Sequence, residues 1–304
     1  MDVAIVSFRA SDLLRRCLAS LREHPPEEAM TVWVVDNASD DGTAEMVARE
    51  FPWVKLVENK ENRGFAAATN QAIRAGDAPY LLVLNPDTRV RSGSLARLVG
   101  LLESNPEVGI CGPRLELADG SFDHAAKRSF PTPLGALGHF SGVGRRSSAS
   151  ERLAQYRAPA VERGPVDAVN GAFMLIRRAA LDEVGLFDEG FWMYMEDLDL
   201  CYRFAEAGWT TWFEPSVVVT HVKAGTTGPH RSFRLNHAFH YGMYRFYRKH
   251  YAPGRSPVVN VAVYAGIALK LVGSMVWSAA ARALGAGVRP ADVRSRGAAS
   301  SPRP

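Results

Sequence analysis

Cysteine is scarce in this sequence, and its placement points to no structural or catalytic use. Three cysteines, Cys17, Cys111 and Cys201, are scattered over 304 residues without a CxxC pair. Their spacing indicates neither a disulfide framework nor a zinc site, and predicts buried thiols in a reducing compartment. The N-terminus has no basic segment followed by a long apolar run, so we expect no signal peptide and a folded part that faces the cytoplasm.

The two common phosphate-binding loops are also missing. No GxGxxG follows the first predicted strand, and no GxxxxGK[ST] occurs anywhere. A nucleotide, if one binds, is therefore not held in the dinucleotide or P-loop manner. Charge of one sign is not in large excess, since the formal net charge is +4, and this says little about partners. With 47% hydrophobic residues, the chain is globular and large enough for one domain with an appendage.

Strand-like and helix-like stretches alternate through the first 85 residues. Short apolar runs predict buried strands, and amphipathic or small-residue patterns predict the helices between them. The predicted strands are 3–8, 31–35, 54–57, 80–84, 108–117, 166–178, 210–213 and 217–220, and the predicted helices include 11–24, 43–51, 65–75 and 92–104. This alternation predicts an α/β fold with a mostly parallel sheet flanked by helices on both faces.

Polar residues follow three of the predicted strands. Ser7, Asp36 and residues 85–87 each stand at the carboxyl end of a strand. Ligands of open α/β sheets bind outside this edge, so the three positions predict a ligand site. The alternative is that Asp36 and Asp87 only form turns, as aspartate often does. An acidic edge would repel phosphates unless a divalent cation were bound, and Asp87 is a hard oxygen ligand suited to Mg²⁺ or Mn²⁺.

The middle of the chain loses regular periodicity. Asp119 and Gly120 are a hairpin-turn signal, and Arg, Ser, Gly and Pro dominate from about residue 124 to 164. Loops of this length are functional or mobile, and we predict a flexible flap over the site. Order returns in the predicted strand 166–178, where Gly171 and Ala172 either allow another group to approach closely or simply pack.

Three carboxylates crowd into four residues where a helix is predicted to begin. Glu196, Asp197 and Asp199 follow an apolar and aromatic approach at 191–195. Acids at a helix N-terminus are favoured by the helix dipole, which alone accounts for many such clusters. The apolar approach favours the alternative that a carboxylate here serves as a general base beside a partly dry pocket. Asp199 and Arg203 are four residues apart, so their pairing is predicted to be structural.

Five segments resemble, in order, the motifs of family 2 glycosyltransferases, in the branch that contains bacterial rhamnosyltransferases. They are VVDNASDDGT from Val34, NRGF from Asn62 with Asn70, LNPD from Leu84, GAFM from Gly171 and EDLDL from Glu196. Each is weak alone, but five in order over residues 1–225 are specific. The resemblance implies a GT-A fold of Rossmann-like architecture, a nucleotide-sugar donor, a divalent metal (Mg²⁺ or Mn²⁺) and inversion at the anomeric carbon.

The resemblance also implies roles for individual residues. Asp197 matches the catalytic base, and Asp36 matches the acid that reads the donor's pyrimidine. Asp87 matches the last acid of the metal-binding DxD motif, although an amide, Asn85, stands at its first position. His221 matches a histidine that completes the metal site in some relatives, whereas a lone histidine at a strand end is more often structural. The implied nucleotide-sugar-binding residues are Ser7, Asp36, Asn62, Arg63, Gly64, Phe65, Asn70, Asn85 and Asp87, and the acceptor-binding residues are Asn170, Gly171, Trp192 and Glu196.

The residue types suit glycosyl transfer better than glycoside hydrolysis. Inverting transfer needs one base for the acceptor hydroxyl, and a metal at Asp87 would stabilise the leaving diphosphate. Hydrolysis needs two carboxylates flanking the bond, but adjacent helical residues such as Glu196 and Asp197 point about 100° apart. Two other classes stay open: a noncatalytic nucleotide-sugar or nucleic-acid binding module, and a nucleotidyltransferase. We find none of the lysine- and glycine-rich phosphate loop expected of the last class.

The C-terminal part has a different composition. At 231–251, basic residues interleave with Phe and Tyr, which predicts a basic amphipathic helix, with nucleic-acid binding as the less favoured alternative. Residues 258–281 are mostly apolar and nearly long enough to span a bilayer, but Lys270 near the middle would be costly there. We predict one or two helices that lie on the membrane, and a true span is the alternative.

The predicted organisation is a GT-A domain at 1–225, membrane-associating helices at 226–285 and a disordered tail at 286–304. Within the domain, the nucleotide-sugar half is about 1–117 and the acceptor half about 165–225. The best guess from the resemblance is transfer of L-rhamnose from dTDP-rhamnose, with a UDP-sugar as the other donor type. The expected acceptor is a lipid-linked saccharide of cell-wall or polysaccharide synthesis at the inner face of the cytoplasmic membrane. No nucleic-acid partner is expected, and an oligomer stays open.

Overall fold

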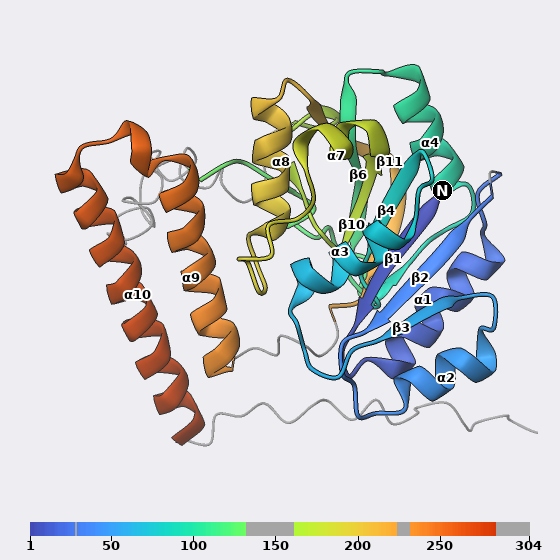
Figure 1. Cartoon of the computed structure of the whole chain (residues 1–304), viewed down its shortest axis with the longest axis horizontal. Coiled ribbons are helices and arrows are strands. Elements are labelled where there is room, and N and C mark those ends of the chain that lie inside the picture. The colour runs from blue at the N-terminus through green and yellow to red at the C-terminus, as the bar shows by residue number, and fades with distance from the viewer. Residues whose placement is uncertain (28, 132–160, 224–231, 284–304) are drawn as a thin grey trace, which may run out of the picture.

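A nine-stranded mixed sheet forms the centre of the molecule and carries helices on both faces (Figure 1). The strand order is β3-β2-β1-β4-β10-β6-β11-β5, and β8 pairs with β11. The computed structural model describes residues 1–27, 29–131, 161–223 and 232–283. One layer of the core lies between the sheet and α1, α2 and α4, and a second lies between the sheet and α3, α7 and α8. The predicted fold class is confirmed.

The first half of the chain forms the parallel part of the sheet, as predicted. Its elements are β1 (Asp2–Ser7), α1 (Ser11–Glu23), β2 (Thr31–Asp36), α2 (Thr43–Glu50), β3 (Lys55–Glu58), α3 (Phe65–Ala75) and β4 (Tyr80–Leu84). Helix α1 buries one stripe, Leu14, Cys17, Leu18 and Leu21, because these residues recur at helical spacing. All four strands run in the same direction, so their carboxyl ends meet at one edge.

The second half adds antiparallel pairings. Its elements are β5 (Thr88–Arg89), α4 (Ser94–Ser104), β6 (Val108–Glu116), β7 (Lys127–Arg128), β8 (Gly164–Pro165), β9 (Ala168–Val169), β10 (Phe173–Arg177), α7 (Arg178–Val184), α8 (Glu196–Glu206) and β11 (Thr210–His221). Strand β10 lies antiparallel between β4 and β6, whereas β11 runs parallel to β6. This insertion places the segment before β10 against the carboxyl end of β4.

Three sequence-based boundaries were wrong. The predicted strand 166–178 is broken into β9 and β10 by a turn at 170–172. The two strands predicted at 210–220 are one strand, β11, whose pairing shifts in register around Pro215. Part of the predicted flap is ordered, because Lys127 and Arg128 form β7 against β9. The rest of that flap, residues 132–160, and the predicted tail lie outside the described residues.

Two long helices follow the sheet and stand beside α8 (Figure 1). They are α9 (Phe233–His250) and α10 (Pro257–Ala283), joined by a short 3₁₀ turn at Ala252–Gly254. Asp199 of α8 is fully buried and accepts hydrogen bonds from Arg203, Lys249 and His250 at 2.7–2.9 Å. Asp188 accepts further bonds from Arg245 and Lys249. The predicted Asp199–Arg203 pair is confirmed, and ionic contacts fix α9 to the helix that begins with Glu196.

We expect Asp199→Asn to lower the free energy of unfolding by about 3 kcal/mol, because it leaves buried cationic partners without their anion. Urea unfolding followed by circular dichroism measures this loss. Asp182→Asn, an exposed change on α7, is the matched control and should leave stability nearly unchanged.

Acid should weaken the same contact. Burial raises the pKa of Asp199, but its bonds from His250 and Lys249 outweigh this and lower it overall. The stabilisation is therefore complete above the unfolded pKa of about 3.9 and is lost as pH falls through the folded value. If Asp199→Asn unfolded at the same urea concentration as the wild type at pH 7, the ion pairs of Asp199 would have no stabilising role.

Candidate active site

The ends of β1 and β2 form one side of the site. Ser7 and Asp36 are paired across these strands, and both are buried. The Ser7 hydroxyl has no hydrogen-bond partner among the described residues, and Asp36 accepts a hydrogen bond from the Ser39 backbone. Burial raises the pKa of Asp36, which indicates a carboxyl that is poorly solvated in the unliganded protein. Both predicted donor-binding groups therefore lie together with hydrogen-bonding capacity to spare.

Asn37 connects this edge to the predicted nucleotide turn. Its side-chain nitrogen donates to Asn62 Oδ1 and to the Gly64 carbonyl, and its oxygen accepts from the Arg63 backbone. Asn62 Oδ1 also accepts from the Gly64 backbone at 3.0 Å. These bonds hold the turn before α3 beside Asp36. The amide side chains of the motif around residue 62 therefore have a structural role in addition to their predicted role in binding.

Trp192 packs against the same turn from the other half of the chain. Gly64 has φ +85°, and a Cβ there would lie 2.3 Å from the Trp192 carbonyl oxygen, so only glycine fits. That carbonyl accepts a hydrogen bond from Phe65 at 2.8 Å, and the Arg234 guanidinium stacks on the indole, 4.0 Å from its centroid. The structure thus brings the predicted donor turn and the predicted acceptor residue Trp192 into contact.

Strand β5 pairs with the end of β11 and sets Asp87 beside His221. His221 Nε2 lies 3.4 Å from Asp87 Oδ1, and His221 Nδ1 lies 3.0 Å from Asp123 Oδ2. Asp87 Oδ1 accepts no hydrogen bond within the residues that the structure describes. Burial lowers the pKa of His221, but these carboxylates outweigh it and raise that pKa to about 9. Burial raises the pKa of Asp123, but hydrogen bonds from His221 and Lys223 bring it down to about 2.

Asp87 and His221 fit a divalent cation. Two neighbouring ligands bound at about 2.1 Å lie roughly 3 Å apart, close to the separation of Asp87 Oδ1 and His221 Nε2. Asp123 fixes the ring through Nδ1, as outer-shell carboxylates do for metal-binding histidines. Over the described ranges, no group of three or more His, Cys, Asp or Glu side chains is placed so that all of them could hold a metal ion. Asn85, phosphate oxygens and water would have to supply the other ligands.

Asp197 lies in the first turn of α8 and is held from three directions. Its Oδ2 accepts from the Gly171 backbone at 2.9 Å and from the Arg128 guanidinium, and its Oδ1 accepts from the Leu198 backbone at 2.8 Å. A Cβ at Gly171 would lie 3.2 Å from Asp197 Cβ. The close approach predicted at Gly171 is therefore made by Asp197 itself.

Glu196, the first residue of α8, is buried, and its Oε2 has no hydrogen-bond partner in the described part of the chain. Burial and the adjacent Asp197 charge raise the pKa of Glu196 to about 8, so its carboxyl is neutral at pH 7. Tyr194 and Met195, just before it, both have φ +71°, a left-handed conformation that costs energy in residues other than glycine. Such strain is common where a side chain must be aimed at a reaction.

The turn at 170–172 joins the metal motif to the Asp197 carboxylate. The Gly171 backbone donates to Asp197, and the carbonyl of the next residue, Ala172, accepts from the Asn85 backbone at 2.9 Å. Asn85 and Asp197 thus contact successive residues of one turn. The turn therefore places the predicted metal motif at 85–87 next to the Asp197 carboxylate.

Two predicted site residues have side chains already engaged inside the protein. Asn70 donates to the Phe187 carbonyl and to Glu189, and accepts from the Phe187 backbone. Asn170 accepts from the Ala172 backbone at 2.8 Å and donates to the Ala125 carbonyl. In this structure both amides hold loops together, and their roles in binding stay predictions.

Sequence reasoning missed three residues of the site: Asn37, Asp123 and Arg128. Asn37 stands inside a quoted motif, next to Asp36, so its position was a usable signal. Asp123 and Arg128 lie in the stretch after the hairpin turn, where periodicity fails and no motif was found. Only the pairing of β7 with β9 brings Arg128 to Asp197.

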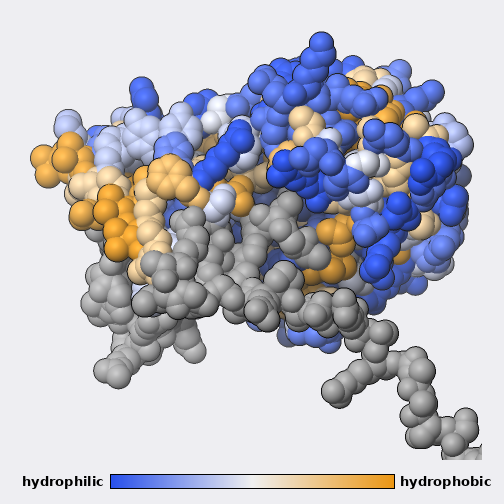
Figure 2. All heavy atoms as spheres, turned by 90° about the horizontal axis from the view of Figure 1, so that it is seen from below, coloured by the Kyte–Doolittle hydropathy of each residue, from blue (hydrophilic) through white to orange (hydrophobic). Residues whose placement is uncertain are grey.

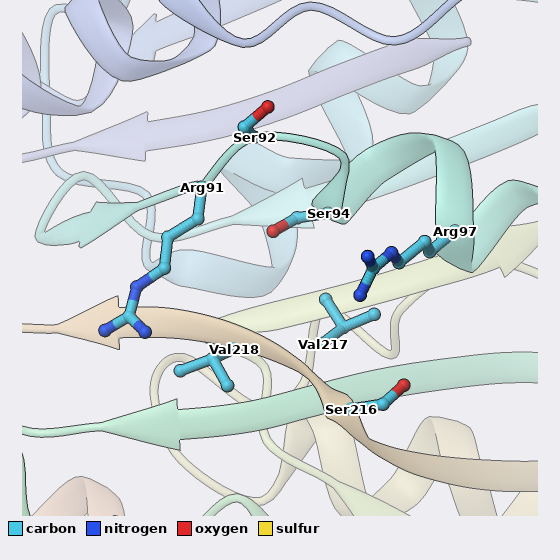
Figure 3. Close-up of a pocket in the computed structure, with 7 residues that line it drawn as sticks. All are labelled: Arg91, Ser92, Ser94, Arg97, Ser216, Val217 and Val218. Atoms are coloured by element: carbon cyan, nitrogen blue, oxygen red, sulfur yellow. The ribbon is translucent and has the colours of Figure 1, made fainter.

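A small pocket lies away from these residues, between the start of α4 and β11 (Figure 3). Its lining is Arg91, Ser92, Ser94, Arg97, Ser216, Val217 and Val218. Arg91 is bound to Glu116, and no carboxylate and none of the predicted site residues line the pocket. Its chemistry does not match that of the strand edge, and we assign it no part in the site.

The model of the family "Glycosyl transferase family 2" matches residues 2–185. N-acetylglucosaminyl-diphospho-decaprenol L-rhamnosyltransferase from Mycobacterium tuberculosis is 34% identical over 240 residues, which cover 75% of this chain and 78% of that protein. Rhamnosyltransferase WbbL from Escherichia coli K12 is 26% identical over 228 residues, which cover 72% of this chain and 82% of that protein.

A solved structure has a similar fold. It is mannosyltransferase PcManGT from Pyrobaculum calidifontis in complex with GDP-Man and Mn²⁺, with a TM-score of 0.56. Sequence identity is 21%, and the match covers 95% of this chain and 75% of that one. At this identity the likeness concerns the fold, and it confirms the predicted GT-A type.

Proposed function

Since the chain belongs to glycosyltransferase family 2 and is a glycosyltransferase, we propose that it transfers L-rhamnose from dTDP-rhamnose to a lipid-linked saccharide with inversion. The sugar and acceptor are inferred from the mycobacterial relative, whose name specifies both a rhamnosyl group and a diphospho-decaprenol acceptor. The polymer built from the product belongs to the cell wall or to a surface polysaccharide under this proposal.

One observation carries the proposal: the turn at 170–172 contacts both the Asn85 backbone and the Asp197 carboxylate. Residues 85–87 bear the donor's diphosphate under this proposal, so the bond to be broken lies close to Asp197. A base for the acceptor hydroxyl is needed at this place and nowhere else in the site. A module that only bound nucleotide-sugars would have no need of it.

The proposed reaction uses one of the two acids of α8 as its base. Asp197, paired with Arg128, takes the proton of the acceptor hydroxyl while that oxygen attacks the anomeric carbon. The bond from this carbon to the diphosphate breaks with its electron pair, and the nucleoside diphosphate leaves with the added charge. Glu196 is neutral and can donate a hydrogen bond to the acceptor without competing for its proton.

A divalent cation at Asp87 and His221, either Mg²⁺ or Mn²⁺, would stabilise the charge on the leaving diphosphate. The protein's part is to hold these two ligands at the end of β4 and β11 before the donor arrives. Asp87 offers an oxygen that accepts no hydrogen bond from residues of the described ranges, and Asp123 orients the imidazole. The Mn²⁺ in the PcManGT complex supports this choice of ion.

We expect Asp123→Asn to weaken Mn²⁺ binding by about 10-fold or more, because an amide holds the imidazole less firmly and adds no negative charge. Electron paramagnetic resonance of free Mn²⁺ in the presence of donor measures the affinity without an activity assay. The matched control is Asp119→Asn in the same hairpin, where the carboxylate is bound only to Ser121 within the described residues. Equal Mn²⁺ affinity in both variants would mean that His221 is not a ligand.

The acceptor's lipid is proposed to reach the site along α10. The contact of this helix with α9 contains two polar pairs, since the Tyr247 hydroxyl donates to Asn260 and the Ser274 hydroxyl donates to Asn236, beside the buried apolar residues Val263 and Ile267. The exposed apolar residues are Val258, Val259, Val261, Leu269, Val272, Val276 and Trp277, and orange apolar surface gathers at this end of the molecule (Figure 2). Residues Pro257–Ala280 form a stretch of 24 residues that is long and apolar enough to cross a bilayer. Only 11% of an 18-residue apolar segment within it is buried in the protein.

Polar pairs between two helices and an outer face of exposed apolar residues are typical of helices in lipid. We propose that α10 lies in the inner face of the membrane, peripherally and without spanning it. Exposed arginines of the same helix pair, Arg234, Arg248 and Arg255, suit anionic head groups. Lys270 is half-buried, so the α9 side shelters part of a residue that would be costly in hydrocarbon.

A thermal-shift screen tests the donor assignment. A ligand that binds the folded state raises the unfolding temperature, so dTDP-rhamnose with Mn²⁺ should stabilise the protein more than UDP- or GDP-sugars do. The same shift without Mn²⁺ would remove the metal from the proposal. No shift with any donor, in protein shown to be folded, would contradict the assignments of Asp36 and Asp87.

A further inference from the structure

We propose that Arg128 is a positioning residue for the transfer reaction and holds the Asp197 carboxylate in place to receive the acceptor's proton. The inference rests on the function proposed above and adds a residue outside all five family motifs. Arg128 lies on β7, in a stretch whose sequence pattern gave no sign of a site.

The contacts of the guanidinium connect two elements. Arg128 Nη2 donates to the Val169 carbonyl at 3.0 Å and also to Asp197 Oδ2. Val169 ends β9, two residues before Gly171, whose backbone donates to the same oxygen of Asp197. One arginine therefore ties β9 to the first turn of α8. The Arg128 and Asp197 side chains are only 19% and 10% exposed, so water competes weakly for these bonds.

The charges around Asp197 leave Arg128 as its counter-ion. On α8, Glu196 is neutral at pH 7 because burial raises its pKa to about 8, and burial likewise raises the pKa of the Cys201 thiol to about 12. Asp199 has its own cations in Arg203 and Lys249 and a further hydrogen bond from His250. In the described part of the chain, the ion pair of Asp197 is the one with Arg128.

Loss of Arg128 should therefore affect the chemical step and spare donor binding. Ser7, Asp36, Asp87 and His221 do not touch Arg128 through any hydrogen bond or ion pair in the described structure. An anion left without its counter-charge would move or take up a proton, and either change removes the base from its position. Misplacement of a reacting group by about 1 Å can cost on the order of 100-fold in rate.

The experiment compares Arg128→Met with Lys127→Met in the full-length protein. Lys127 is the neighbouring cation of the same strand, but it contacts the Val161 carbonyl and the Phe213 ring instead of Asp197. We expect Arg128→Met to lower kcat about 100-fold while the Kd of the donor, measured by calorimetry, changes less than twofold. Arg128→Lys should recover part of kcat, added methylguanidinium should partly rescue Arg128→Met, and Lys127→Met should resemble the wild type.

Other results would overturn the inference. A weakened donor Kd in Arg128→Met would make Arg128 a donor ligand, and an equal loss of kcat in Lys127→Met would make the effect one of packing. Asp197→Asn, assayed in parallel, distinguishes a failure of the proposed function from a failure of the Arg128 inference. If it still transfers sugar, the proposed base is wrong; if it is inactive while Arg128→Met turns over normally, the Arg128 inference alone fails.

Discussion

Asp197→Asn should lower kcat by between about 10² and 10⁴-fold while leaving the Kd of the donor almost unchanged. An amide cannot take up the acceptor's proton, but it keeps the size of the side chain, and its one oxygen can still accept from either the Gly171 or the Leu198 backbone. Steady-state transfer to a lipid-linked acceptor gives kcat, and calorimetry with donor and Mn²⁺ gives Kd. The split between the two constants is the signature of a group that acts in the reaction.

Two further variants make this result specific. Glu196→Gln should cost less than about 10-fold, because the native carboxyl is neutral at pH 7 and an amide resembles that form. Asp77→Asn changes an exposed carboxylate just before β4, at the opposite edge of the sheet, and should have no effect. If Asp197→Asn retained full transfer, or if Glu196→Gln were the inactive one, Asp197 would not be the base. A noncatalytic binding module would show no dependence on either residue.

The parallel half of the fold was predictable from sequence because buried strands need continuous apolar runs and their helices need one apolar stripe. Strand β4 was predicted with its exact bounds for this reason, and β1 to β3 within one residue at each end. The polar strand ends could also be placed, since parallel strands that alternate with helices share one carboxyl edge. Ser7 and Asp36 needed no more than this rule to be brought together.

The second half was less predictable because its strands are short and paired across long distances in the chain. The turn at 170–172 looks like part of an apolar strand, and only its contacts with Asn85 and Asp197 show why the strand must break there. Arg128 illustrates the same limit. A two-residue strand has no periodicity to detect, and its ion-pair partner is 69 residues away.

Charge within the site was a further property that residue types alone did not reveal. Glu196 and Asp197 are adjacent acids in the sequence, yet among the described residues Glu196 Oε2 is buried without a hydrogen bond, whereas Asp197 has an arginine and two backbone donors. Burial raises the pKa of Glu196 to about 8, a shift that the sequence does not show. Likewise, the hydrogen bond between Asp123 and His221, which orients the imidazole, becomes visible only when the fold is known.

The helix α10 should be responsible for membrane binding, and two charges on its outer face should abolish it. Leu269 and Val276 are 73% and 62% exposed, although each would gain about 1.5–3 kcal/mol by leaving water. We therefore expect Leu269→Asp with Val276→Asp to reduce partitioning into anionic vesicles by about 100-fold or more. Vesicle flotation with phosphatidylglycerol-containing liposomes measures the bound fraction. The matched control is Ser92→Asp with Ser104→Asp, two exposed positions of the catalytic domain.

The same double variant tests why a glycosyltransferase would carry such a helix. Transfer to an acceptor embedded in vesicles should fall with membrane binding, whereas transfer to a short-chain, water-soluble acceptor should stay at the wild-type rate. That split is expected because the ion pair of Asp199 fixes α9 to α8, and the ion pairs of Asp188 fix α9 to the loop before α8, so α10 can leave the membrane without disturbing Asp197. A variant that floats like the wild type would show that this face does not meet lipid. Equal losses with both acceptors would show that α10 supports the fold of the active site instead of delivering the enzyme to its substrate.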